Sequence, residues 1–288
     1  MQTTKLALAL LALPIVASSA CGKQTFLAAA FIQTPQLPNP VDPAHPIPAF
    51  AVMTAYLGTI DTTDPTKIDT KKIGVVTGAN VNVAFKHLRD VSVAGDTDQD
   101  RIVSVPESAG QPGLYTVTSR DQGKLSFEKD VPYTMILQTP GASSEAYGAR
   151  LTPGPQATIQ EFPASAPFVE HAIKDAFTVT RTDKAADGSR LPAFIVVAKI
   201  DPRNPNSEPQ ITFKTVPEKP EDLLKFVLSD ADYRWASYPI PVKAFPDADS
   251  FYVVSVLAVR IGKVSDNAFL GSTALAASGA AGLVHTHL

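Results

Sequence analysis

The sequence has almost no cysteine. Cys21 is the only cysteine in the 288 residues, so the chain has no second thiol with which to form an internal disulfide. A C-x-x-C metal or redox motif is excluded for the same reason. The chain must therefore draw its stability from hydrophobic cores.

The sequence also lacks an excess of charge of either sign. Its 25 Lys and Arg residues stand against 28 Asp and Glu residues, which gives a formal net charge of -3. A nucleic-acid partner is not expected, because no basic surplus is present to neutralise phosphates. Hydrophobic residues make up 44% of the chain and charged residues 18%, and this balance is typical of a folded globular protein.

Catalytic motifs are missing as well. The chain has no G-x-S-x-G elbow, no H-E-x-x-H pair and no glycine-rich phosphate loop. Ser126 and Lys129 match S-x-x-K by letter, but they lie where an expected strand ends at a turn, and the partner motifs S-D-N and K-T-G are absent. The sequence therefore predicts a non-enzymatic protein without a cofactor, with a hydrolase of unrecognised site as an alternative.

The first 20 residues have the layout of a secretory signal peptide. Lys5 precedes an apolar run over residues 6–16, which is too short to span a bilayer as a mature helix, and small residues follow. The position of Cys21 directly after these small residues resembles the lipobox of bacterial lipoproteins. Ser18 stands where that family favours Leu, Val or Ile. Ser18 and Ala20 also suit the general signal peptidase, which leaves ordinary secretion as the alternative.

The lipobox resemblance implies that Cys21 becomes the new N-terminus and carries a lipid that anchors the chain in a membrane. Gly22, the residue after the cysteine, is compatible with outer-membrane sorting in such families because it is not Asp. The sequence thus predicts an exported lipoprotein of the outer membrane, on either of its faces, with an envelope protein or a glycan as its partner.

Two proline-rich segments divide the mature chain. Residues 21–48 contain six prolines between positions 35 and 48, which favours an extended, semi-rigid tether. Within it the apolar stretch 26–32 is a candidate strand. Residues 152–167 are a second proline-rich segment and form the predicted linker. The remaining ranges, 49–151 and 168–288, are each long enough to bury a core of their own.

The range 49–151 has the pattern of a β-sandwich domain. Residues 81–85 alternate between apolar and small or polar side chains, as a half-buried strand does. Short strands with Gly, Pro and Asp between them are typical of sandwiches. The strands that we expect here are 50–57, 81–85, 102–105, 113–119, 124–127, 131–138 and 147–151.

Three sequence stretches in this first domain carry a family resemblance. They are G-A-N-V-N-V at 78–83, G-L-Y-T-V at 113–117 and K-L-S-F-E-K-D-V-P-Y-T-M at 124–135. The order resembles transthyretin-like or carboxypeptidase-regulatory-like sandwiches of bacterial surface lipoproteins. The resemblance implies a fold and an exported context, and it implies no activity.

The range 168–288 has a similar pattern. Residues 193–200 form a continuous apolar run, which predicts a strand buried on both faces, and residues 221–228 are a candidate short helix. The other expected strands are 177–181, 211–215, 238–245, 250–261 and 269–285. The pattern resembles immunoglobulin or fibronectin type III sandwiches, so the predicted fold is all-β with two β-sandwich domains in tandem.

Two clusters could hold a metal ion. Asp96, Asp98 and Asp100 alternate along the chain and could converge on a calcium ion, although Arg101 occupies the position where an EF-hand loop needs glycine. The alternative is a solvated acidic turn between two strands. His285 and His287 would point the same way on a strand and could share a metal, or they could belong to a frayed terminus.

The leading functional prediction is a structural or protein-interaction module of the cell envelope. The alternative is a module that binds a carbohydrate or another small molecule, which aromatic side chains along one face would favour. A pocket that brings His87 or His171 together with carboxylates would instead favour a hydrolase. The aromatic residues to inspect are Tyr115, Tyr133, Tyr233, Trp235 and Tyr238.

Overall fold

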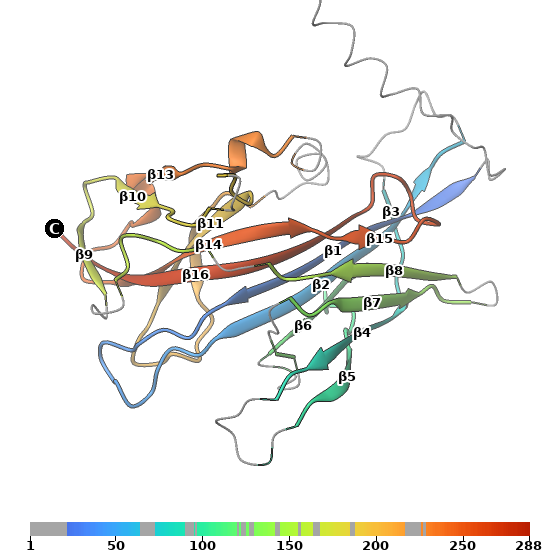
Figure 1. The fold of residues 1–288 in the computed structure, drawn as a ribbon, viewed down its shortest axis with the longest axis horizontal. Coiled ribbons are helices and arrows are strands. Elements are labelled where there is room, and N and C mark those ends of the chain that lie inside the picture. Colours follow the sequence, from blue (N-terminus) through green and yellow to red (C-terminus); the bar gives the residue numbers. More distant parts are fainter. Residues whose placement is uncertain are drawn as a thin grey trace, which may run out of the picture.

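The structure is an all-β arrangement of three sheets (Figure 1). The computed structural model describes residues 22–63, 73–89, 95, 97–119, 121, 125–126, 130–141, 145–154, 157–163, 168–184, 188–216, 226 and 229–288. The prediction of an all-β chain is confirmed. None of the helical segments in these residues is both long and apolar enough to cross a membrane.

The largest sheet has nine strands and runs along the long axis of the molecule (Figure 1). Its order is β12-β11-β14-β16-β1-β2-β3, with β6 beside β2 and β9 beside β16. The strand β16 is parallel to β1 and to β9, whereas the other pairs are antiparallel. The strands are β1 (Lys23–Thr34), β2 (Phe50–Asp61), β3 (Gly74–Val75), β6 (Leu114–Thr118), β9 (Val169–Ala172), β11 (Ala193–Ile200), β12 (Gln210–Lys214), β14 (Phe251–Ile261) and β16 (Thr273–His287).

Two smaller antiparallel sheets complete the fold. The five-stranded sheet has the order β15-β8-β7-β4-β5, and the two-stranded sheet pairs β10 with β13. Their strands are β4 (Asn80–His87), β5 (Gln99–Ser104), β7 (Tyr133–Gln138), β8 (Ala146–Leu151), β10 (Phe177–Thr180), β13 (Ser237–Ile240) and β15 (Lys263–Val264).

The structure differs from the expected tether over residues 21–48. Residues 23–34 form β1, which lies between β2 and β16 near the middle of the large sheet. Leu27, Ala29 and Phe31 are at most 2% exposed, so this segment is part of a core. The candidate strand 26–32 is confirmed, and the proline-rich stretch 35–48 is the connection between β1 and β2, where the chain turns back on itself.

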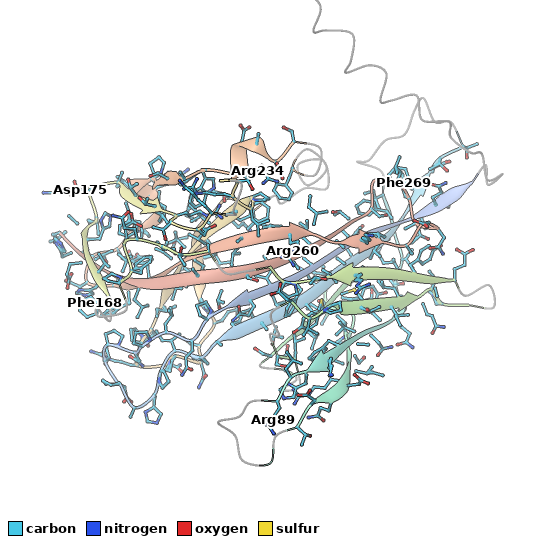
Figure 2. All side chains as sticks on the ribbon, in the orientation of Figure 1. Arg89, Phe168, Asp175, Arg234, Arg260 and Phe269 are labelled. Carbon is cyan, nitrogen blue, oxygen red and sulfur yellow. The ribbon has the colours of Figure 1, made fainter. Side chains whose placement is uncertain are left out.

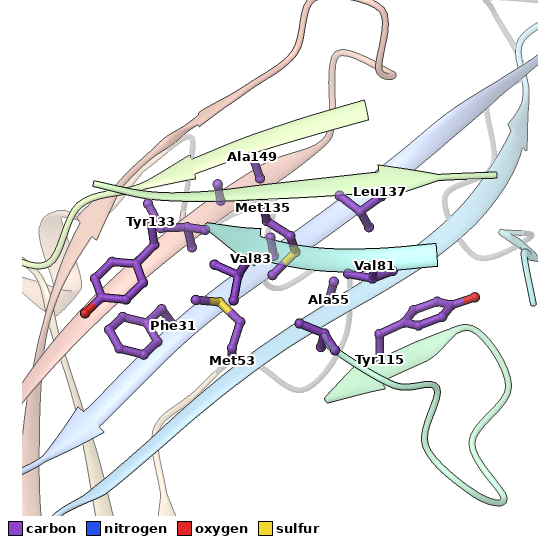
Figure 3. Packing of buried hydrophobic residues seen from close by; sticks show 14 of the residues in the cluster. Phe31, Met53, Ala55, Val81, Val83, Tyr115, Tyr133, Met135, Leu137 and Ala149 are labelled. Atoms are coloured by element: carbon purple, nitrogen blue, oxygen red, sulfur yellow. The ribbon is translucent and has the colours of Figure 1, made fainter. Parts of the chain in front are cut away.

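The first core lies between the large sheet and the five-stranded sheet (Figure 3). Alternate residues of β1, β2, β6 and β16 face alternate residues of β4, β5, β7 and β8, as two stacked sheets require. Phe31 stacks on Tyr133 with ring centroids 4.4 Å apart, and Tyr133 stacks on Phe85 at 4.7 Å. This core combines strands from the predicted first domain with β1 and β16.

The second core lies on the same face of the large sheet, further along β16. There β11, β14 and the C-terminal half of β16 pack against β10, β13 and the turn η2 (Val242–Ala244). Ala157, from the predicted linker, is 3% exposed in this core. Ser278 Oγ also donates a hydrogen bond to the carbonyl of Gly154, at 2.8 Å. The linker residues therefore pack on the sheet, and strands from both sides of the linker share that sheet.

The strand β16 is built from small residues because it is covered on both faces. The sequence predicts a final strand from the small apolar tail, and the structure places it between β14 and β1. At Gly279 a Cβ would lie 2.7 Å from the carbonyl oxygen of Gln33. At Gly282 it would lie 2.0 Å from the ring of Phe162. Glycine is therefore needed where a neighbouring strand or an aromatic ring approaches the backbone.

Three other expected elements have different outcomes. The expected strand 238–245 is interrupted: β13 ends at Ile240, and Pro241 caps the 3-10 helix η2, because proline removes a ladder donor. The candidate helix 221–228 lies outside the described residues except for Phe226, which has a helical conformation. Of the expected strand 124–127, the described residues Leu125 and Ser126 are not in a strand.

Candidate ligand-binding pocket

A pocket of about 520 Å³ opens on the face of the large sheet opposite the two main cores. Its floor comes from the side chains of β11, β12 and β14 that alternate with the core-facing ones. A volume of this size is within the range of small-molecule sites in proteins. The residues that line the floor are Val196, Ala198, Ile200, Ile211, Val253 and Ser255.

The first wall of the pocket is the connection between β1 and β2. Leu37 and Ile47 pair across this connection through two backbone hydrogen bonds, of 3.0 and 2.9 Å. Between them the chain reverses through bends and a turn, closed by a hydrogen bond from the His45 N–H to the Asp42 carbonyl, so residues 35–49 form a hairpin-like arm. Leu37 and Ile47 are 7% and 8% exposed because they pack on Leu283 of the sheet. The arm thus covers one end of the sheet and borders the pocket.

Asn39 joins the arm to the opposite wall, which is the loop between β11 and β12. Its side-chain Nδ2 donates to the carbonyls of Pro202, at 2.8 Å, and His45, at 2.9 Å. Its Oδ1 accepts the backbone N–H groups of Val41 and Asp42. Asn39 is 2% exposed, and its polar atoms are satisfied as burial requires. It therefore holds the two walls at a fixed separation.

The polar rim of the pocket is acidic. Among the described lining residues, the charged ones are Asp121 and Glu208, and both are exposed carboxylates. Asp121 Oδ2 accepts hydrogen bonds from the backbone N–H of Thr118, at 3.2 Å, and from its hydroxyl, at 2.7 Å. The pocket therefore combines an apolar floor with negative charge at its edge.

The predicted acidic cluster is only partly described. Asp96 lies outside the described residues, and Asp100 is exposed on β5 opposite Lys86 of β4. Asp98 Oδ1 accepts the backbone N–H of Arg89 at 2.7 Å, and its Oδ2 lies 3.7 Å from Lys86 Nζ. In the part of the chain that the structure describes, no three His, Cys, Asp or Glu side chains form a group that could hold a metal ion.

Glu107, eleven residues after Asp96, has a structural role. Its carboxylate accepts the backbone N–H groups of Gly113, at 2.7 Å, and Gly78, at 2.8 Å. These two hydrogen bonds hold the pKa of the Glu107 carboxyl below its usual value. Its two oxygens thus tie together the turns that precede β4 and β6.

The histidines do not gather in the pocket. His171 lies 8% exposed in β9, with its ring against Phe177 and Phe245 at 5.2 and 5.0 Å. Burial lowers the pKa of His171, so the neutral ring is favoured. His87 ends β4, away from the lining residues. The arrangement that would favour a hydrolase is therefore absent from the described lining of the pocket.

The C-terminal histidines belong to an ordered strand. His285 lies in β16 opposite Glu170 of β9, and its Nδ1 is 3.0 Å from the Glu170 carboxylate. Its ring also stacks on Phe251 at 4.5 Å. His287 ends the same strand and is exposed. The frayed-terminus alternative therefore does not describe this segment, because β9 pairs with it as far as His287.

The aromatic residues proposed as a carbohydrate platform do not line the pocket. Tyr115 and Tyr133 are fully buried in the first core. Trp235 packs on the second core beside Tyr238, and its Nε1 donates to the carbonyl of Ala193 at 3.2 Å. Tyr233 packs on Phe226 and Phe194. Phe50 is the only aromatic side chain among the described lining residues.

Sequence reasoning did not find the pocket, because its lining comes from five separate segments with no shared motif. The one available signal is the proline-rich segment that becomes the arm, and its composition predicts a tether. No protein-family model matches this chain, and no curated protein is significantly similar to it in sequence.

Proposed function

We propose that this protein is a non-enzymatic binding protein of the cell envelope that holds an apolar ligand in the pocket on its large sheet. The observation that carries the proposal is the pocket itself, with its apolar floor of β11 and β14 residues and its walls clasped by Asn39. Apolar pockets with a few convergent polar groups are the usual form of small-molecule sites. A carbohydrate is a poorer fit, because Phe50 alone among the described lining residues offers an aromatic surface.

The protein is carried on the outer membrane by a lipid on Cys21, after removal of residues 1–20. Gly22, the next residue, is fixed to the fold through its carbonyl oxygen, which accepts hydrogen bonds from the backbone N–H and the hydroxyl of Thr62. Thr34, at the other end of β1, lines the pocket. At about 3.3 Å per residue, the twelve residues of β1 separate the anchor from the pocket by about 40 Å.

The protein consists of two sandwich-like units that share the large sheet, and the two hydrophobic cores support this description. One unit is the core between the large sheet and the five-stranded sheet, and the other is the core under β10 and β13. The shared strands give the protein a rigid axis between the anchor and the pocket.

A pocket-filling substitution tests the proposal. Replacing Ala198, which is 8% exposed on the floor of the pocket, by Trp places an indole where the ligand lies. We expect the neutral fluorescent probe N-phenylnaphthylamine to bind Ala198→Trp at least about tenfold more weakly than wild type, a loss of about 1.4 kcal/mol. Fluorescence titration measures this difference.

The matched control is Ile136→Trp, on the outer face of β7, where Ile136 is 48% exposed and remote from the pocket. It should leave probe binding unchanged, and circular dichroism should show that both variants are folded. If Ala198→Trp does not fold, Ile200→Trp on the same floor replaces it. If the wild type and a folded pocket-filled variant bind the probe with equal affinity, the pocket is not the binding site.

The acidic rim predicts which polar end the ligand carries. A cationic or neutral end is favoured beside Asp121 and Glu208, whereas a carboxylate is repelled there. We expect dodecylamine to displace the probe at about tenfold lower concentration than dodecanoate does. The substitution Glu208→Gln should reduce this tenfold difference between the displacing concentrations of dodecylamine and dodecanoate. Asp266→Asn, at an exposed site beyond β15, should leave it unchanged. Preference for dodecanoate would contradict the charge argument.

A structural or protein-interaction role is the second candidate, with an envelope protein or a glycan as the partner. The feature that favours it is β5, which ends the five-stranded sheet and pairs on one side only, with β4, among the described strands. Ile102 of β5 is 71% exposed, and open strand edges can accept a strand from another protein. Photo-crosslinking from position 102 in intact cells would identify such a partner.

A further inference from the structure

The loop between β15 and β16 lies beside the first residues of β1. The backbone N–H of Phe269 donates to the carbonyl of Thr25 at 2.7 Å, and the hydroxyl oxygen of Ser272 accepts the backbone N–H of Leu27 at 3.0 Å. Figure 2 shows Phe269 at the end of the molecule where β1 begins, far from Phe168 and Asp175 at the opposite end. This loop is therefore fixed within a few residues of Cys21.

The tip of this loop presents a leucine to solvent. Leu270 is 98% exposed, the largest exposure of any large hydrophobic residue among those described. The turn is closed by a hydrogen bond from the backbone N–H of Ser272 to the carbonyl of Phe269, at 2.8 Å. The Phe269 ring lies under Gly271, where a Cβ would be 2.6 Å from it. The ring and the hydrogen bond therefore hold Leu270 outward instead of letting it fold back onto the sheet.

A second exposed apolar residue lies near the same end. Val75 of β3 is 50% exposed and pairs with Gly58, which in turn pairs with Phe26 of β1. Val75 is thus in register with a residue five positions from Cys21. An isolated exposed leucine is common on protein surfaces. A leucine held outward beside a lipid attachment site is in a position to enter the same apolar phase as the lipid.

We propose that Leu270 inserts into the surface of the lipid bilayer and, together with the lipid on Cys21, fixes the orientation of the protein on the membrane. The inference rests on the lipid anchor of the proposed function. An acyl anchor alone lets a protein body tilt, whereas a second apolar contact adds affinity and restricts the orientation. With both contacts at one end, β1 points away from the membrane and the pocket is held on the far side.

Site-directed fluorescence tests this contact on the full-length protein. The substitution Leu270→Cys introduces a thiol for an environment-sensitive dye, because the single native thiol of Cys21 is blocked when it carries a lipid. The labelled protein is reconstituted in vesicles of phosphatidylethanolamine and phosphatidylglycerol that contain a lipid-attached quencher. The matched control is Ile102→Cys, at a site that is 71% exposed and remote from the tip.

We expect blue-shifted emission from position 270 and at least about twofold stronger quenching by the lipid quencher than at position 102. Emission typical of water at position 270, with lipid mass present on Cys21, would overturn the inference and leave the anchor in place. Blue-shifted emission without lipid quenching would also overturn it, because a second protein surface would then cover the tip.

The experiment gives a different result if Cys21 carries no lipid. In that case Cys21 reacts with the dye in the wild-type protein, and the proposed lipidation is wrong. The tip is then tested with residues 1–21 replaced by a hexahistidine tag that holds the chain on vesicles with nickel-chelating lipids. Lipid quenching at position 270 in this chain supports the insertion of Leu270, and its absence refutes it.

Discussion

Replacing Phe31 by alanine should lower the free energy of unfolding by about 3–5 kcal/mol. Phe31 has no exposed surface and lies between the two sheets of the first core, stacked on Tyr133 at 4.4 Å (Figure 3). Alanine would leave a cavity there, since Met53 and Val83 beside it are held in strands and cannot collapse into the space. Urea denaturation followed by circular dichroism measures the change.

The matched control is Ile32→Ala, one residue further along β1. Its side chain is half-buried on the opposite face of the sheet, so the loss should be clearly smaller, below about 2 kcal/mol. A flexible tether would give almost no loss at either position. Equal stability of wild type and Phe31→Ala would therefore contradict the placement of β1 in the core.

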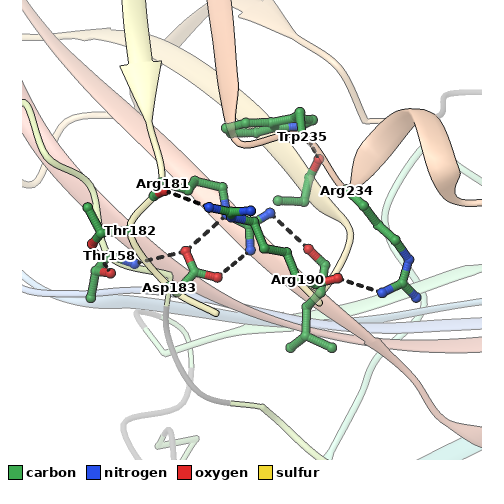
Figure 4. A network of polar contacts seen from close by, with 9 residues as sticks. Thr158, Arg181, Thr182, Asp183, Arg190, Arg234 and Trp235 are labelled. Atoms are coloured by element: carbon green, nitrogen blue, oxygen red, sulfur yellow. Dashed lines mark hydrogen bonds and ion pairs between the residues drawn. The ribbon is translucent and has the colours of Figure 1, made fainter. Parts of the chain in front are cut away.

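The substitution Asp183→Ala should cost about 3–5 kcal/mol of stability, because it leaves a buried guanidinium without its counter-charge. The side chain of Arg181 has no exposed surface and pairs with Asp183 through two hydrogen bonds, of 3.1 and 2.6 Å (Figure 4). Its Nη1 donates to the carbonyl of Leu191 at 2.8 Å, and the guanidinium lies 5.3 Å from the Trp235 ring. The same denaturation measurement applies.

Two variants separate the buried charge from a general loss of packing. Asp230→Ala removes a similar two-bonded carboxylate from Arg234, whose side chain is 41% exposed, and we expect a loss below about 1 kcal/mol. The double variant Arg181→Met with Asp183→Ala removes both charges and should recover much of the stability lost in Asp183→Ala. A double variant no more stable than Asp183→Ala would show that the pair matters through packing alone.

Strands with strong local patterns could be predicted from the sequence. The apolar run 193–200 matches β11, and the β-branched stretch 250–261 contains β14. The period-two alternation over residues 81–85 likewise predicts a strand, which is β4 in the structure. These segments are recognisable because their burial follows from their own residue types.

The placement of β1 could not be predicted, for physical reasons. Its two neighbours are β2, the next strand, and β16, which is about 250 residues away and parallel to it. Pairing at such separation leaves no local pattern. The six prolines that follow β1 indicated a tether more strongly than its alanines indicated a strand. The continuity of the large sheet across the predicted linker could not be predicted either, because it also depends on pairing between strands far apart in the sequence.

The pocket was hidden by its construction from distant segments. The proline-rich composition of residues 35–49 predicts an extended segment, but the chain reverses there between Leu37 and Ile47 and lies against the sheet, which makes it a wall of the pocket. The hydrogen bond from the Asn39 side chain to the carbonyl of Pro202 joins residues 163 positions apart. No sequence pattern around either residue indicates this contact. Successive side chains of β11 point to opposite faces of the sheet, so that one set lines the pocket and the other set packs in the second core.

Native mass spectrometry of the protein purified from its own envelope shows directly whether the pocket holds a ligand. The variant Cys21→Ser allows purification without detergent, and it is compared with the same chain carrying Ala198→Trp. We expect an adduct on the first chain that organic extraction removes and that is neutral or cationic when identified, with no adduct on the second. The same adduct on both chains, or an anionic lipid on the first, would contradict the assignment of the pocket.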